Sequence, residues 1–118
     1  MFKVLPFLTK RKGIETRAFI DYYEQKHVPL ICSLAPTPIV YKRRYVLERL
    51  TTEGGAIDFD VVTELGFDDR ADYLAWMAKL SAPGARERVS ADEARFLDRS
   101  RTRAYVVEEY VTGDSAVR

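Results

Sequence analysis

The chain has 118 residues, of which 47% are hydrophobic and 31% are charged. This length suffices for one domain with a single core. The formal net charge is +1, so the chain as a whole has no strong attraction to nucleic acid or to an anionic membrane. Because no apolar run approaches the length of a membrane span, we expect a soluble globular protein without a nucleic-acid or membrane partner.

The counts of cysteine and histidine restrict the possible chemistry further. Cys32 is the only cysteine and His27 the only histidine. One cysteine cannot form an internal disulfide, and the two residues together supply too few ligands for a zinc site. The first eight residues are too short and wrongly flanked for a signal peptide. We therefore expect no metal, no other cofactor and a cytoplasmic location.

The first half of the chain predicts a strand, a helix and a second strand. Residues 2–9 favour a strand, although Pro6 predicts a bulge or an unpaired position there. A helix is expected from residue 15 or 16 to about 34. Pro29 lacks a backbone donor and its ring clashes with the carbonyl of Gln25, so we expect this helix to kink or break near His27. Residues 35–38 form a connector, and residues 39–50 predict a long strand.

The second half predicts a hairpin, two helices and a closing strand. Residues 51–56 are a turn, and residues 57–67 alternate in hydrophobicity with a period of two. Asp68 or Asp69 caps a helix that ends at residues 83–84. The pattern Ser90-x-x-Glu93 predicts the start of a short last helix, and Asp98 is expected to brace the turn into a strand over residues 103–112. Residues 113–118 are a tail.

The order of these elements predicts the fold. Strand, helix, strand, strand, helix, strand is the order of the ferredoxin-like βαββαβ unit, an α+β fold with a four-stranded antiparallel sheet and helices on one face. One domain over residues 1–112 would include all of it. The uncovered face is too apolar to be fully wet, since Val62 lies on the same side as Asp60 and Glu64. A homodimer joined through the two sheet faces would cover it.

His27 is the most informative residue. At 100° per residue its ring lies on the apolar face of the predicted helix, which also carries Phe19, Tyr23, Leu30 and Leu34. An imidazole titrates near neutral pH and can transfer protons. The alternative is a core histidine with one satisfied hydrogen bond.

Three segments resemble a known family. Residues 19–30, ending in His27-x-Pro29-Leu30, are similar to the first-helix signature of EthD-like proteins in the dimeric α/β-barrel superfamily, and residues 58–65 and 92–98 also resemble that family. The resemblance implies a homodimer that forms an α/β barrel, with a pocket between sheet and helices in each subunit. Members of this family include cofactor-free enzymes of polyketide and aromatic metabolism and accessory proteins beside monooxygenases. The resemblance therefore implies a function of one of these two kinds. The motif histidine matches His27, whereas Arg44 stands where many relatives carry Asn or His.

Two further residues are candidates for acid/base chemistry with His27. Tyr23 lies one turn earlier on the same face and would polarise a substrate carbonyl, or it is a core aromatic residue. Asp60 would orient His27 or act as a second acid or base. Alternatively, Asp60 pairs with a lysine or arginine across the sheet or the dimer.

Three more residues are candidates for substrate binding. Arg44 would bind a carboxylate or phenolate oxygen, or it is an interface partner of Asp60. Tyr41 lies on the same predicted strand as Arg44. Trp76 on the second helix would line a pocket, or it is part of the core.

These features support two classes of function. The first is a small cofactor-independent lyase, cyclase, dehydratase or isomerase that acts on an aromatic or polyketide-like carbonyl compound through His27. The alternative is a non-catalytic protein that binds a hydrophobic ligand, or an accessory protein beside a monooxygenase or degradation pathway. A histidine that faces a cavity and has a polar partner on its other nitrogen would favour the enzyme, whereas side chains filling that space would count against it.

Overall fold

The computed structural model describes residues 1–56 and 58–113. Ile57 and all of the predicted tail except Gly113 lie outside the described residues. The elements in chain order are β1 (Phe2–Leu8), α1 (Thr16–Tyr22), the π-helical turn η1 (Tyr23–His27), α2 (Val28–Leu34), β2 (Val40–Tyr45), β3 (Val61–Phe67), α3 (Arg70–Leu80), α4 (Ala85–Phe96), the 3₁₀ turn η2 (Arg99–Arg101) and β4 (Arg103–Val107).

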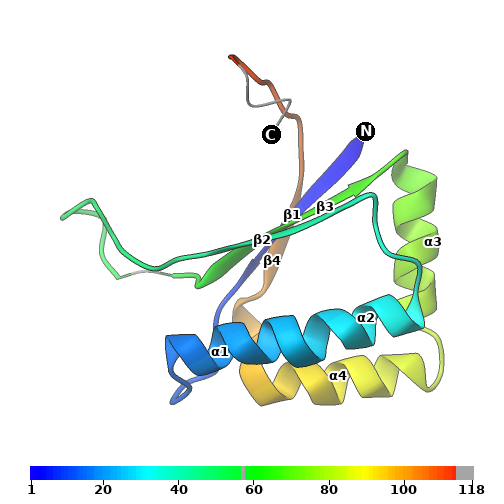
Figure 1. Ribbon diagram of the computed structural model, residues 1–118, viewed down its shortest axis with the longest axis horizontal. Coiled ribbons are helices and arrows are strands. Elements are labelled where there is room, and N and C mark those ends of the chain that lie inside the picture. Colours follow the sequence, from blue (N-terminus) through cyan, green and yellow to red (C-terminus); the bar gives the residue numbers. More distant parts are fainter. Residues whose placement is uncertain (57, 114–118) are drawn as a thin grey trace.

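The four strands form one antiparallel sheet in the order β2-β3-β1-β4. The continuous helix α1–α2, together with α3 and α4, covers one face of this sheet (Figure 1). This arrangement confirms the predicted α+β, ferredoxin-like fold. Alternate residues of β1 and β3, such as Val4, Leu8, Val61 and Leu65, point toward the helices and are buried.

We expected a kink or a break near His27; the helix over residues 16–34 is distorted there but does not break, so the break is wrong. The chain instead widens into the π turn η1, in which the amide of Val28 donates to the carbonyl of Tyr23, five residues earlier. A wider turn moves the carbonyl of Gln25 away from the proline ring, which removes the clash that an α-helix would impose. α1 and α2 therefore run on as one helix (Figure 1).

The π turn also changes which residues of this helix are buried. The buried positions recur at every fourth residue, through Phe19, Tyr23, His27, Ile31 and the following Ala35. An ideal α-helix drifts by about 40° over four residues, and the extra residue in the π turn offsets part of this drift. The predicted apolar face is therefore correct up to His27 and shifted by one position beyond it.

The hairpin between β2 and β3 is longer than predicted. β2 ends at Tyr45, and β3 begins at Val61. A hydrogen bond of 2.9 Å from the amide of Val46 to the carbonyl of Asp60 extends the pairing by one step. Beyond it the loop leaves the sheet (Figure 1), and Leu50 is 87% exposed. The strand predicted over residues 46–50 is wrong, because the apolar side chains of Leu47 and Leu50 are left exposed by the residues that the structure describes.

The last helix also begins earlier than predicted. α4 starts at Ala85, and the amide of Gly84 donates to a carboxylate oxygen of Glu87 at 2.6 Å. Ser90 therefore lies in the middle of α4 and does not cap it. The closing strand β4 ends at Val107 rather than at residue 112.

Two local predictions are confirmed and a third is met only in part. Asp69 caps α3 by accepting from the amide of Asp72, and Asp98 accepts from the amide of Ser100 in the turn before β4. At Pro6 the register between β1 and β3 is unchanged on both sides, so there is no bulge, but the paired positions pass over Leu5 and Pro6. Pro6 does lie opposite Ala104 of β4.

Candidate functional site

His27 is held rigidly at the end of the π turn. Only 6% of its surface is exposed. Its ring lies 5.1 Å from the ring of Tyr23 and 5.0 Å from the ring of Phe96, between centroids. Its Nδ1 atom lies 2.7 Å from Oδ2 of Asp92 on α4. Within the described residues, Nε2 has no hydrogen-bond partner in the protein. Such packing fixes the ring and leaves one nitrogen free to react.

Asp92 is the functional residue that the sequence interpretation missed. Its side chain is buried, and its other oxygen accepts a hydrogen bond of 2.7 Å from the hydroxyl of Tyr22. A signal was present, because Asp92 precedes the predicted core residue Phe96 by one helical turn. An acid on the buried face of a helix requires a partner, and His27 is the partner here.

The burial of His27 sets its charge state. Loss of contact with water lowers the pKa of His27 below its ordinary value of 6.5, although the hydrogen bond and the charge of Asp92 act in the opposite direction. The imidazole is therefore neutral at pH 7. A neutral ring whose Nδ1–H donates to the carboxylate carries a lone pair on Nε2. This tautomer is the one that a general base needs.

His27 faces a cavity of about 360 Å³ between the sheet and its helices. This volume lies within the range of ~300–1,000 Å³ that is typical of small-molecule sites. Its buried part, which we call the inner end, is lined by Tyr23, His27 and Thr63, and its exposed part, which we call the mouth, is lined by Met77, Arg86, Arg99, Thr102 and Ala104. The lining residues are Val4, Pro6, Leu8, Tyr23, His27, Ile31, Tyr41, Thr63, Leu65, Tyr73, Trp76, Met77, Leu80, Ser81, Arg86, Val89, Ser90, Glu93, Arg99, Thr102 and Ala104.

Two phenol side chains share the inner end of the cavity with His27. The hydroxyl of Tyr23 lies 2.6 Å from the hydroxyl of Thr63. Burial raises the pKa of Tyr23 to about 12. Burial and the neighbouring Tyr23 also raise the pKa of Tyr41 above its ordinary value. Both phenols therefore keep their protons at neutral pH and are available as hydrogen-bond donors.

The structure brings together four of the six predicted site residues. His27, Tyr23, Tyr41 and Trp76 line the same cavity. Asp60 does not line it. Its carboxylate accepts a hydrogen bond of 2.7 Å from the backbone amide of Lys10.

Arg44 also lies away from the cavity, on the uncovered face of the sheet. Its guanidinium donates to Glu64 at 2.9 Å, and Lys3 donates to the same carboxylate at 2.8 Å. The partner of Arg44 is therefore Glu64 rather than Asp60. The alternation of β3 separates these groups from His27, because residues 62, 64 and 66 point away from the helices.

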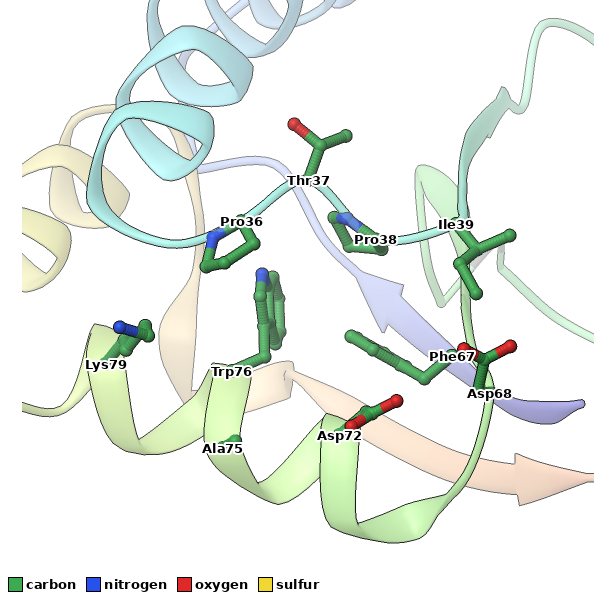
Figure 2. A pocket seen from close by; sticks show the side chains of 10 residues that line it. All are labelled: Pro36, Thr37, Pro38, Ile39, Phe67, Asp68, Asp72, Ala75, Trp76 and Lys79. Carbon is green, nitrogen blue, oxygen red and sulfur yellow. The ribbon is translucent and has the colours of Figure 1, made fainter.

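Trp76 also lines a second hollow of about 260 Å³, between α3 and the connector that precedes β2. Figure 2 shows the indole standing between α3 and the connector that holds Pro36 and Pro38, with its nitrogen directed toward the connector. Trp76 Nε1 is buried, and among the residues that the structure describes it has no hydrogen-bond partner. The rim of the second hollow carries Asp68, Asp72 and Lys79.

Two further searches gave negative results for the described residues. Among residues 1–56 and 58–113, no group of three or more histidine, cysteine, aspartate or glutamate side chains is placed to hold a metal ion. In the same part of the chain, no helix has the length and apolar character to cross a membrane.

Comparisons with known proteins identify the family. Solved structures with similar folds include an EthD family protein from Bacillus halodurans, with 18% sequence identity, a TM-score of 0.63, and coverage of 93% of this chain and 100% of the other. HapK from Hahella chejuensis shares 14% identity, a TM-score of 0.61 and 98% coverage of each chain. At3g17210 from Arabidopsis thaliana shares 10% identity, a TM-score of 0.64, and coverage of 96% of this chain and 99% of the other. No curated protein matches by sequence. The model of the EthD domain matches residues 11–100, so the chain belongs to the EthD domain family.

Proposed function

We propose that this protein is a small enzyme that needs no cofactor and that acts as a lyase, cyclase, dehydratase or isomerase on an aromatic or polyketide-like carbonyl compound. One observation carries the proposal: His27 is neutral and oriented by Asp92, and it lies against a cavity large enough for an aromatic ring. A purely structural histidine would have its free nitrogen satisfied or packed against side chains.

The proposed mechanism uses His27 as the base. Nε2 takes a proton from the carbon next to the substrate carbonyl. The electron pair of that C–H bond forms a new carbon–carbon double bond, while the π pair of the carbonyl moves onto its oxygen and gives an enolate. The carboxylate of Asp92 stabilises the imidazolium that results. His27 then returns the proton at another carbon, which completes an isomerisation, or to a leaving hydroxyl, which completes a dehydration.

The proposed mechanism uses phenols to stabilise the enolate. Tyr23 and Tyr41 lie at the same end of the cavity as His27, and both keep their protons at neutral pH. A protonated phenol in a buried site is a strong donor to a developing oxyanion. We assign the proposed oxyanion contact to Tyr23, since its ring packs directly against His27.

A homodimer joined through the sheets is part of the same proposal. The uncovered sheet face presents the apolar side chains of Leu5, Phe7, Val62 and Tyr105, and Tyr105 is 52% exposed. Phe7 and Tyr105 stack edge to face at 5.8 Å between centroids. A contiguous apolar surface of this kind is typical of an interface.

The test is a panel of aromatic and polyketide carbonyl compounds, assayed with the unmodified protein and with the His27→Gln and Asp98→Asn variants. Glutamine keeps a polar side chain of similar reach but has no basic nitrogen. Asp98 caps the turn before β4 and does not line the cavity, so Asp98→Asn is the matched control. We expect turnover to be lost only in His27→Gln. Equal turnover by all three proteins would refute the role of His27, and ligand binding without turnover would favour the non-catalytic alternative.

A further inference from the structure

We propose that the ligand of the His27 cavity carries a negatively charged group, such as a carboxylate, and that Arg86 binds this group at the mouth while the ring system extends inward to His27. This inference deepens the proposed function, because it rests on the same cavity and adds the charge and the orientation of the ligand.

The cavity changes in character along its length. At its inner end His27, Tyr23 and Thr63 are all at least 94% buried, with exposures of 6%, 2% and 2%. Much of the remaining lining is apolar and includes Val4, Ile31, Leu65 and Trp76. The exposed lining residues, which form the mouth, come from the end of α3, from α4 and from the segment that runs from η2 to β4. A ligand that fits this sequence of surroundings has a polar reacting end, an apolar body and a polar group that stays near solvent.

The charges at the mouth leave one cation without a partner. Arg99 lies 3.5 Å from Glu93 and donates to the hydroxyl of Ser90 at 3.3 Å, so its charge is compensated. Arg86 also lines the cavity, and its guanidinium has no ion pair or hydrogen bond within the residues that the structure describes. A guanidinium binds a planar carboxylate through two parallel hydrogen bonds. An anionic group is therefore the substituent that this mouth fits.

Helix α4 sets the distance between the two ends. Arg86 and Asp92, which holds His27, lie six positions apart on this helix, a rise of about 9 Å. Arg86, Val89, Ser90 and Glu93 follow one another along the cavity wall at the spacing of a single helix face. A backbone rise of about 9 Å between these positions leaves room for a fused two-ring acid, so a compound of that size is a suitable probe.

The experiment measures binding rather than turnover. The probes are 6-hydroxy-2-naphthoate and its uncharged methyl ester, titrated by calorimetry against the unmodified protein, Arg86→Gln and Arg88→Gln. Arg88 is exposed on the same helix and does not line the cavity, so it is the matched control for loss of one positive charge.

We expect Arg86→Gln to weaken binding of the acid about five- to tenfold, a size that suits a partly solvated charge pair, and to leave the ester unchanged. Arg88→Gln should leave both probes unchanged. The preference of the unmodified protein for the acid should shrink in 1 M salt.

Equal losses for acid and ester, no loss for the acid in Arg86→Gln, or failure of both probes to bind the unmodified protein would each overturn the inference. The proposed catalytic function fails by a different result, since acid binding through Arg86 without turnover of any carbonyl compound would leave this inference standing.

Discussion

Asp92→Asn is the substitution that separates an oriented catalytic base from a core histidine. The carboxylate accepts hydrogen bonds of 2.7 Å from both His27 and Tyr22. The amide of the variant has one oxygen, so it can accept only one of them, and its NH₂ group would face the other donor. Hydrogen bonds to a charged group contribute about 1.5–3 kcal/mol each, and we expect the free energy of unfolding to fall by about 2–3 kcal/mol.

The same substitution should change the tautomer of His27. If the NH₂ group faces Nδ1, that nitrogen becomes an acceptor, and the proton moves to Nε2, the atom that has to act as the base. We expect turnover to fall by about 100- to 10,000-fold. The pKa of His27 should also fall further, because Asp92 favours the charged ring.

The chain suits a direct measurement, since His27 is its only histidine. The ¹⁵N chemical shifts of one imidazole report both tautomer and pKa without assignment ambiguity. Tyr22→Phe is the control: it removes the other hydrogen bond to Asp92, and we expect it to lower stability without changing the tautomer. An unchanged tautomer and an unchanged pKa in Asp92→Asn would refute the assigned role of Asp92.

Further predictions concern pH, the oxyanion donor, the dimer and one glycine. The folded state holds the pKa of His27 below 6.5, so the unfolded chain takes up the proton first and the free energy of unfolding falls as the pH drops below about 6.5. Urea unfolding from pH 8 to 5 should show this decrease. A decrease of the same size in His27→Gln would exclude His27 as its source. Tyr23→Phe should lower turnover about 10- to 100-fold and cost about 1 kcal/mol of stability, and unchanged kinetics would remove Tyr23 from the mechanism. Tyr105→Glu should yield monomers in sedimentation experiments. The control Leu74→Glu, at a site on α3 that is 55% exposed, should leave the dimer intact. A dimer that persists in Tyr105→Glu would count against the sheet interface. A Cβ at Gly66 would lie 2.8 Å from Val40 Cβ, so Gly66→Ala should lower stability by about 1–3 kcal/mol in denaturant titrations, and an unchanged midpoint would show that β2 can move away.

The accuracy of the sequence interpretation depends on how local each signal is. The strand β1 is indicated by consecutive residues, and the Asp69 cap of α3 depends on residues within one helical turn. Both predictions were confirmed. The hairpin loop was not predictable in this way. Residues 46–50 carry three apolar side chains and continue the predicted strand, but a strand also needs a partner and a covering layer. Within the described residues the pairing with β3 ends at Val46, and Leu47 and Leu50 are exposed. Such long-range context is absent from a local pattern.

The uncovered sheet face illustrates a second limit. The pattern of β3 places Glu64 correctly on the face away from the helices, where Arg44 was expected to pair with Asp60. Which acidic residue Arg44 contacts depends on register, and the pairing of Arg44 with Val62 in the ladder brings its guanidinium next to Glu64. A strand shifted by two residues would have the same faces and a different partner. Periodicity therefore predicts faces, whereas ion pairs require the register.

The site itself depends on both kinds of information. Pro29 is a local signal, and it correctly indicates a distortion beside His27, although the distortion is a π turn rather than a break. The partner of His27 lies 65 residues away on α4, and no spacing rule connects the two. What connects them is physical necessity: the buried face of α4 carries an acid, the buried face of the first helix carries an imidazole, and each is costly to bury without the other. If this argument is correct, the pair should be coupled. The double variant His27→Gln/Asp92→Asn should then be less destabilised than the sum of the two single variants by 0.5 kcal/mol or more, a difference that denaturant titrations can resolve, and strict additivity would show that the two side chains are buried independently.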